Sequence, residues 1–301
     1  MKRELANFIA RESSYHFLVR DWLGKSDIDI MQYFFGLDFF HHQLRPVEPN
    51  LAHYKNVILL APHQDDESIG AGGVLQKLNR QGSNITIVYV TDGAQKNIPN
   101  TDVEESVEVR FKEVEEALKN INCSIEKMNI SNMSPKPTID DLNHLSDLIK
   151  KYEPDLILLP WLLDIPVKHR MVNHMLVLCD QIKPIRNCEI WGYQVHNHLY
   201  PNIVINISEE MEEKIRMIEA FESQNKNFKP HNKITKGMNA YNAKYLRGAD
   251  YVEIFFASPV QKYVEIVRQT YFSNLKQTYK NSIPVFKVMS NLSFSSKRIE
   301  E

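Results

Sequence analysis

Four side chains that bind metals or move protons occur within five residues of the chain, namely His63, Asp65, Asp66 and Glu67. His63 and Asp66 are three residues apart, so on a tight turn both side chains reach one point. A catalytic zinc ion usually takes three protein ligands from His, Asp or Glu and keeps a fourth position for water. We expect Asp65 to point elsewhere and to take a proton from that water. The pattern indicates metal-assisted hydrolysis of an amide or ester.

A third ligand is expected from a neighbouring strand end about 100 residues later in the chain. His169 is well placed for this, and His174, in Val-Asn-His, is the alternative. The two are five residues apart at a helix start, so they face different directions and cannot easily both bind. Asp164 is expected either to accept a hydrogen bond from a ligand histidine or to cap the following helix.

The motif has two other interpretations. An acidic loop often only caps a helix, because carboxylates stabilise helix N-termini. The three glycines that follow, Gly70, Gly72 and Gly73, also suggest a phosphate-binding loop. No Lys-Ser or Lys-Thr follows Gly73, however, and the preceding carboxylates would repel a phosphate. The phosphate loop is therefore disfavoured.

Strands and helices alternate around this motif. Apolar, β-branched runs predict strands at 57–60, 85–90, 125–130, 156–159, 189–195, 203–207 and 251–256. Helical spacing of apolar residues fills most of the gaps, and the helix after the motif is expected over residues 70–80. Residues 224–248 read as a long polar loop with a short helix near the site. This alternation predicts an α/β fold with a parallel, doubly wound sheet. In such a sheet, ligands bind at the carboxyl ends of the strands, where the motif lies.

The domain organisation is expected to be one large domain with extensions. We assign residues 1–50 to an N-terminal helical and aromatic extension, 51–275 to the main domain and 276–301 to a C-terminal tail. The aromatic residues of the extension either pack on the main domain or form a dimer or partner surface.

Composition excludes several classes of protein. A net charge of −2 argues against nucleic-acid and acidic-membrane binding, which both need a basic surplus. No apolar stretch is long enough to span a membrane. The three cysteines, Cys123, Cys179 and Cys188, form no close pair and indicate buried thiols in a reducing compartment. We therefore expect a cytoplasmic protein.

Residues 62–73, Pro-His-Gln-Asp-Asp-Glu-Ser-Ile-Gly-Ala-Gly-Gly, resemble the signature of the PIG-L/LmbE-like zinc-dependent de-N-acetylases. The resemblance extends over roughly residues 55–258. Three further segments match the family: Thr91-Asp92-Gly93, residues 110–117 with their Arg-x-x-Glu-x-x-x-Ala pattern, and the spacing of Pro160, Asp164 and His169. Later segments resemble its bacterial sugar-modifying branch: residues 191–195, Lys214, Ser223-Gln224, Arg247-Gly248 and residues 251–255.

The resemblance implies a Rossmann-like three-layer sandwich with a mostly parallel central sheet. It implies a divalent metal, usually Zn²⁺, and removal of acetyl from an N-acetylated amino sugar or glycoconjugate precursor, for example in polysaccharide biosynthesis. By position, the metal ligands are His63, Asp66 and His169, and the base is Asp65. Arg110 and Arg247 are candidate substrate contacts, or else solvated charges.

The chain departs from the family pattern before the third ligand. Many members have a histidine three residues before it and an acid directly before it, where this chain has Pro166 and Lys168. The missing histidine helps to stabilise or protonate the reacting group in the family. His196 or His198 could substitute, or both could be surface residues.

Two rival functions stand beside this interpretation. One is a metallo-amidase that acts on another acyl group or on an amide that is not a sugar. The other is a glycan- or partner-binding protein without turnover. The expected partner in the first interpretation is a small-molecule N-acetyl sugar or sugar conjugate, and a homo-oligomer is compatible with the sequence.

Overall fold

The computed structural model describes residues 46–96, 102–227 and 230–272. The helices and strands of these residues follow one another in chain order: η2 (Leu51–His53), β1 (Asn56–Ala61), α5 (Asp66–Arg80), β2 (Asn84–Thr91), α6 (Val103–Leu118), β3 (Cys123–Ile130), α7 (Ile139–Tyr152), β4 (Leu156–Pro160), α8 (Val167–Ile182), β5 (Glu189–Tyr193), β6 (Ile203–Asn206), α9 (Met211–Glu219), α10 (Glu222–Asn227), α11 (His231–Asn242), η3 (Ala243–Tyr245), β7 (Val252–Pro259) and α12 (Val260–Phe272).

The strands form a seven-stranded sheet in the order β3-β2-β1-β4-β5-β7-β6. The first five are parallel, whereas β7 runs antiparallel to both β5 and β6. The chain builds outward from β1 through β2 to β3, then returns to the other side of β1 to begin β4. The space between the carboxyl ends of β1 and β4 is therefore the topological switch point, where ligands bind in such sheets.

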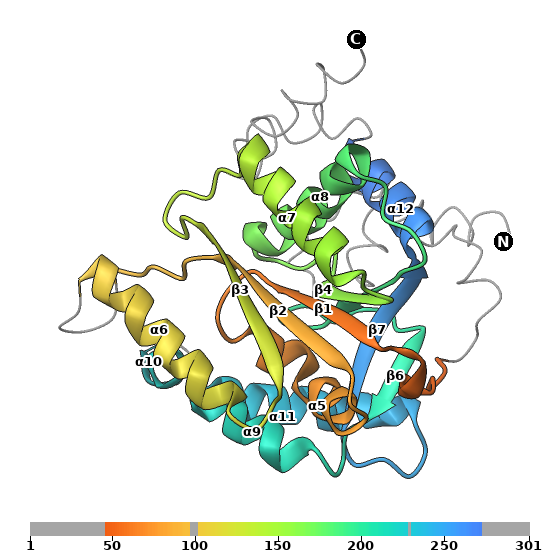
Figure 1. Ribbon diagram of the computed structural model, residues 1–301. Coiled ribbons are helices and arrows are strands. Elements are labelled where there is room, and N and C mark those ends of the chain that lie inside the picture. Colours follow the sequence, from red (N-terminus) through yellow and green to blue (C-terminus); the bar gives the residue numbers. More distant parts are fainter. Residues whose placement is uncertain (1–45, 97–101, 228–229, 273–301) are drawn as a thin grey trace, which may run out of the picture.

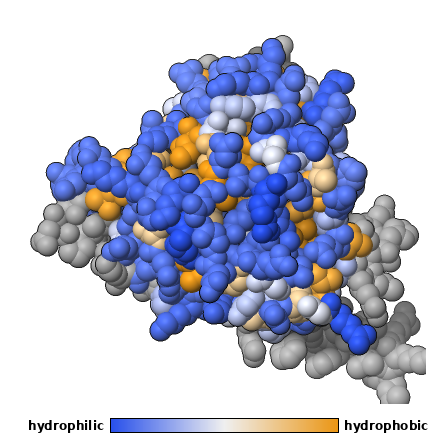
Figure 2. Space-filling model, turned by 60° about the horizontal axis from the view of Figure 1, so that its bottom comes forward, coloured by the Kyte–Doolittle hydropathy of each residue, from blue (hydrophilic) through white to orange (hydrophobic). Residues whose placement is uncertain are grey.

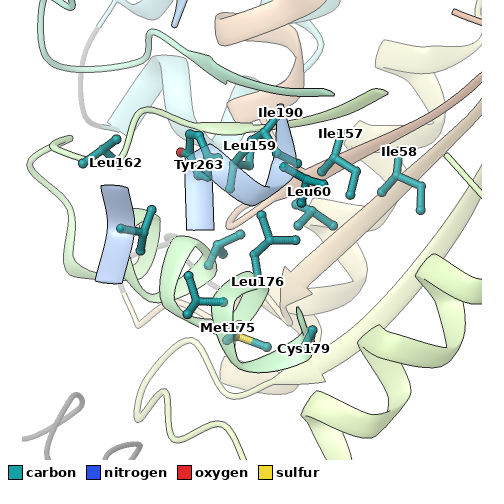
Figure 3. Close-up of a cluster of buried hydrophobic side chains, with 14 of the residues drawn as sticks. Ile58, Leu60, Ile157, Leu159, Leu162, Met175, Leu176, Cys179, Ile190 and Tyr263 are labelled. Carbon is teal, nitrogen blue, oxygen red and sulfur yellow. The ribbon is translucent and has the colours of Figure 1, made fainter. Parts of the chain in front are cut away.

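Helices cover both faces of the sheet, which gives three layers (Figure 1). Helices α7, α8 and α12 pack on one face, and α5, α6 and α9 pack on the other. Strand β1 shows why both faces are covered, because Ile58 and Leu60 enter one core whereas Val57 and Leu59 enter the other. Figure 3 shows how Met175 and Leu176 of α8 face the β1 and β4 side chains in the first core. The predicted three-layer α/β fold with a mostly parallel sheet is confirmed.

Two expectations need correction. Residues 224–248 are largely helical, since they contain the end of α10, all of α11 and η3. Helix α5 also begins at Asp66, before the glycines, because the Asp65 carbonyl accepts hydrogen bonds from the Ser68 and Ile69 amides. The predicted N-terminal helix and aromatic run lie outside the described residues, and the domain boundaries stay a prediction.

The surface at the bottom of the view in Figure 1 is mainly polar. Figure 2 shows this side with hydrophilic residues over most of its area and apolar residues in small patches. Among the described helices, none is both long enough and apolar enough to cross a membrane.

Candidate metal centre and its surroundings

The metal centre predicted from the sequence assembles at the switch point. His63 and Asp66 follow β1, and His169 lies in the first turn of α8, which follows β4. One potential ligand atom from each residue lies within 4.8 Å of the others. The Asp66 Oδ2 atom is 3.0 Å from His63 Nδ1 and 3.3 Å from His169 Nε2. His174 is buried further along α8 and is not part of this group.

The orientation of His169 fits a metal ligand. Its Nδ1 atom is 2.8 Å from Asp164 Oδ2, and both side chains are fully buried. Its buried Nε2 atom makes no hydrogen bond within the described part of the chain. A ligand histidine normally donates one ring N–H to a carboxylate so that the other nitrogen faces the metal. Two imidazoles and one carboxylate are also the donor set that zinc takes in catalytic sites.

Asp164 holds His169 and does not cap the helix. Helix α8 has Pro166 at its N-cap, with no side-chain cap. The second carboxylate oxygen of Asp164 accepts hydrogen bonds from the amides of Ile165 and Asn197, at 2.9 and 3.0 Å. Both oxygens are thus used to orient His169 and to fix the loop after β5.

The charges at this centre favour a cation. Burial disfavours the charged form of His169, but the carboxylates of Asp66 and Asp164 outweigh burial and raise its pKa to about 10. Burial lowers the pKa of His63 to about 4, so this imidazole is neutral near pH 7 and keeps a lone pair for a metal. A site that stabilises a positive charge so strongly is suited to a divalent ion.

Asp65 stands beside these candidate ligands in a strained backbone conformation. Its φ is 141° and its ψ is −25°, which an L residue rarely adopts. Its amide donates to Glu67 Oε2 at 3.1 Å, and its carbonyl is held by the first turn of α5. This turn separates the side chains of Asp65 and Asp66, so that the second joins the metal group whereas the first does not.

Arg110 supports the same turn from α6. Its guanidinium is 1% exposed, donates to the Gln64 carbonyl and lies 3.6 Å from Asp65 Oδ1. Burial raises the pKa of Asp65 well above its usual value, and the positive charge of Arg110 opposes that rise. Arg110 is therefore placed to hold the candidate base.

Arg247 is exposed in the turn after η3. The substrate contacts assigned to Arg110 and to Arg247 stay predictions.

The Thr91-Asp92-Gly93 segment braces the metal loop from β2. Thr91 donates through its hydroxyl to the Pro62 carbonyl at 2.7 Å, and its own carbonyl accepts from Gln64 Nε2 at 3.1 Å. Gly93 has a φ of 72°, and a Cβ placed there would lie 2.1 Å from Gln64 Oε1. Only glycine allows this close approach.

The sequence placed Lys168 directly before His169 but did not reveal Asn132, which lies near the centre with it. The half-buried Lys168 ammonium donates to the Asn132 side chain, and its charge acts on both Asp66 and His63. Asn132 is fixed by its own amide, which donates to Asp92, and by its Nδ2, which donates to the Ala94 carbonyl. Asn132 follows β3, so its position at the carboxyl edge of the sheet could have identified it as a site residue from the sequence.

His196 also comes close to the centre. Its ring centroid is 5.4 Å from that of His169, and its side chain is exposed. His198, two residues later, contacts tyrosines instead. Of the two histidines considered as substitutes for the missing one, the structure brings His196 to the metal group.

Residues 58–179 match the family model described as PIG-L, GlcNAc-PI de-N-acetylase. Over these residues the chain is similar to the PIG-L family. They include the metal group, Asp65 and Arg110, so the resemblance inferred from the motifs is confirmed.

Three known proteins are similar to this chain in sequence or structure. It is 26% identical over 196 residues to diacetylchitobiose deacetylase from Thermococcus kodakarensis, covering 56% of this chain and 70% of that protein. The structure of N,N'-diacetylchitobiose deacetylase from Pyrococcus horikoshii has a TM-score of 0.59 and 22% identity, covering 71% of this chain and 87% of that one. A 4-carboxy-2-hydroxymuconate hydratase from Pseudomonas putida has a TM-score of 0.57 and 16% identity, covering 67% and 95%. The structural likenesses establish the fold, which does not by itself fix the reaction.

Proposed function

We propose that this chain is a metal-dependent hydrolase that removes the acetyl group from an N-acetylated amino sugar. The observation that carries the proposal is the convergence of His63, Asp66 and His169 at the switch point, with Asp65 beside them. The PIG-L family match and the diacetylchitobiose deacetylase relative support the reaction class. Zinc is the expected metal because of the donor set.

In the proposed mechanism, His63, Asp66 and His169 would hold the metal. A divalent metal in this position supplies Lewis acidity and lowers the pKa of water. Asp65 accepts a proton as the water oxygen attacks the acetyl carbonyl carbon, and its raised pKa makes it a better proton acceptor. The C–N bond then breaks, the leaving nitrogen takes a proton, and acetate and the free amine are formed.

Two residues supply what the missing histidine of the family pattern supplies, which is protonation or stabilisation of the reacting group. His196 is placed to donate the proton to the leaving nitrogen, since it is exposed next to His169. Lys168 places a positive charge where the acyl oxygen becomes negative. Pro166, in contrast, has no side-chain proton to give and only starts α8.

The finer parts of the proposal concern the substrate and its setting. We propose a sugar carried on a nucleotide or lipid, deacetylated in the cytoplasm during polysaccharide biosynthesis. N-acetylglucosamine is the expected acetylated unit, because the matched family is described by that group. A homo-oligomer is compatible with this role.

Acetate release and metal content test the proposal together. The wild type should release acetate from N-acetyl sugars and contain about one divalent ion per chain. Asp65→Asn should keep the metal and lose at least about a hundredfold in kcat, because a general base contributes 10²–10⁴-fold. His63→Ala should lose both metal and activity. Undiminished acetate release by either variant would exclude this mechanism.

A second candidate function is glycan binding without fast turnover, or turnover of another acyl group. It is favoured by Pro166 and Lys168, which replace the histidine and acid of the family pattern. A panel of sugars with acetyl, propionyl and longer acyl groups separates these cases. Full metal occupancy with no product from any of them would favour binding alone.

A further inference from the structure

Helix α11 has its polar side turned inward and apolar residues turned outward. Its buried residues are Thr235, Asn239 and Asn242, which are all polar. Ile234 and Tyr241, in contrast, are 41% and 61% exposed. A surface helix normally buries its apolar stripe against the core, so this arrangement is the reverse of the usual one. The complete exposed side of the helix comprises Lys233, Ile234, Lys236, Gly237, Ala240 and Tyr241.

Buried hydrogen bonds fix this orientation of α11. Asn239 Nδ2 donates to the Val252 carbonyl at 3.0 Å, at the start of β7. Asn242 Nδ2 donates to Gln194 Oε1 at 2.9 Å, directly after β5. Rotation of the helix to bury Ile234 would leave these groups without partners, which is costly in the interior. The outward apolar side is therefore a fixed feature of the fold.

The same side of α11 is basic. Residues 223–249 contain six Lys or Arg and no Asp or Glu, although the whole chain has 36 basic and 38 acidic residues. Lys244 of η3 lies beside the exposed side of α11, with its ammonium 3.7 Å from the Tyr241 ring centroid. We name the exposed side of α11 together with Lys244 the basic face. The net charge of −2 is thus an average over unequal surfaces, and it does not describe this one.

The charges of the basic face are not neutralised. Within the part of the chain that the structure describes, Lys233, Lys236 and Lys244 form no ion pair. Glu219 borders the face, where it accepts a hydrogen bond from Asn232 Nδ2 at 2.8 Å. The face therefore combines unpaired positive charge with exposed apolar side chains.

We propose that the basic face docks on a membrane surface that carries anionic lipids, with α11 parallel to that surface. Ile234 and Tyr241 enter the boundary between headgroups and acyl chains, and the three lysines bind lipid phosphates. Helices with a basic side and an apolar side lie in the membrane interface in this way, and tyrosine is enriched at headgroup level. This inference goes beyond the proposed function and does not depend on it.

The shape and chemistry of the basic face favour a lipid surface over a nucleic acid. Gly237 has open space around it, since a Cβ placed there would meet no atom within 4 Å. With only Gly237 and Ala240 between the larger side chains, the helix can approach a flat surface closely. A nucleic acid would bind the lysines through its phosphates but would leave Ile234 without an apolar contact.

Vesicle flotation of the full chain tests the proposal. The chain should bind phosphatidylcholine vesicles that contain about one third phosphatidylglycerol, but not vesicles of phosphatidylcholine alone, and binding should weaken at high salt. A lysine near an anionic surface contributes about fivefold, so Lys233→Gln with Lys236→Gln should lower the partition coefficient about twenty-fivefold. No binding to the anionic vesicles, or equal binding by this variant, would overturn the proposal.

Lys119→Gln with Lys262→Gln is the matched control for charge. It removes the same number of positive charges from exposed lysines that pair with Glu116 and Glu265. The control should keep the partition coefficient within about twofold, because exposed pairs of this kind are already locally neutral. A loss as large as that of Lys233→Gln with Lys236→Gln would show that only the total charge matters, and would contradict the assignment.

A second variant tests the apolar contact. Ile234→Ser with Tyr241→Ser keeps the charge and should lower the partition coefficient at least about tenfold, because the apolar side chains no longer enter the interface. Ile139→Ser, an exposed position at the start of α7, should have no effect. All of these positions are exposed, so the thermal midpoints should stay unchanged. Binding of the double serine variant at the level of the wild type would exclude insertion and overturn the proposal.

Fluorescence follows position 241 directly. In Tyr241→Trp, the added indole emission should move to shorter wavelength with anionic vesicles and be quenched by brominated lipids, with the wild type as background. Trp161 and Trp191 are buried and should not respond. Quenching no greater than in the wild type would overturn the proposal. Binding of duplex DNA that depends on Lys233 and Lys236, with none of the anionic vesicles, would assign the basic face to a nucleic acid and overturn it as well.

Discussion

At the scale of single residues, the φ angle of Asp65 directs two adjacent aspartate side chains to different neighbours. The positive φ of Asp65 turns the chain between the end of β1 and the start of α5. Asp66 then joins His63 and His169, whereas Asp65 faces Arg110. Strain of this kind persists only where surrounding contacts enforce it, and it often occurs in active sites.

Lys168 provides a test at the same scale. Its ammonium is half-buried and acts on His63 and Asp66, and it donates to Asn132. We expect Lys168→Met to lower kcat about a hundredfold while KM changes little, because one donor to a developing negative charge is worth 10²–10³-fold. Lys168→Arg should restore part of kcat because it keeps the charge.

Steady-state kinetics with metal analysis measures this effect. The control is Lys119→Met, because Lys119 pairs with Glu116 on the surface at the end of α6. An unchanged kcat in Lys168→Met would show that the charge takes no part in the reaction. A lost metal would instead assign Lys168 to the integrity of the site.

At the scale of elements, α5 is two helical segments joined at a kink. Ala71 has non-helical angles, with φ −142° and ψ 15°, inside the glycine-rich part of the motif. The amides of Gly73 and Val74 beyond the kink donate to Glu253 at 2.8 and 2.9 Å. Glu253 also pairs with Lys214 Nζ at 2.6 Å, and both side chains are buried. These contacts explain why the family-like segments that contain Lys214 and Glu253 occur together with the motif at residues 62–73.

Loss of the Glu253 carboxylate should therefore destabilise the fold. We expect Glu253→Gln to lower the free energy of unfolding by about 3 kcal/mol or more, because it leaves Lys214 charged and buried without its partner. The matched control is Glu265→Gln, which breaks the exposed pair with Lys262 and should cost less than about 1 kcal/mol. Urea unfolding measures both, and equal losses would contradict the role of Glu253.

Strands β1 and β4 and helix α11 show where prediction from sequence succeeds and where it fails. Strands β1 and β4 were predicted because their apolar runs are continuous, as burial on both faces requires. Only a short helix was expected where α11 lies, because its buried side chains are Thr235, Asn239 and Asn242, which make no apolar stripe. Two of these hold the helix by hydrogen bonds, from Asn239 to the Val252 carbonyl and from Asn242 to Gln194. Such partners lie far away in the sequence.

At the scale of the whole molecule, the strand order decides what the site contains. The convergence of His63, Asp66 and His169 could be predicted because each follows a strand and matches a family motif. The closeness of Lys168 to Asn132, and of His196 to His169, depends on the packing of separate loops. No periodicity in the sequence encodes these distances, so the sequence offered both His196 and His198 as candidates, and the structure shows that His196 lies beside His169.

The metal group also joins two halves of the sheet, which gives a prediction for the stability of the molecule. His63 and Asp66 belong to the β1 side of the switch point, whereas His169 belongs to the β4 side. A metal that binds only the folded chain stabilises it by about 2.7 kcal/mol at a hundredfold excess over its Kd. For a domain of this size, we expect the thermal midpoint to rise by about 5 to 10 °C.

Thermal unfolding with and without Zn²⁺ checks this prediction. His63→Ala should abolish the shift, because two ligand residues then remain. His144→Ala, a surface substitution on α7, should keep the full shift and controls for zinc bound by exposed histidines. A chelator should return the wild type to the midpoint of the metal-free chain. If Zn²⁺ raised the thermal midpoint of His63→Ala as much as that of the wild type, the stabilising ion would be bound elsewhere. The three residues at the switch point would then not form its site.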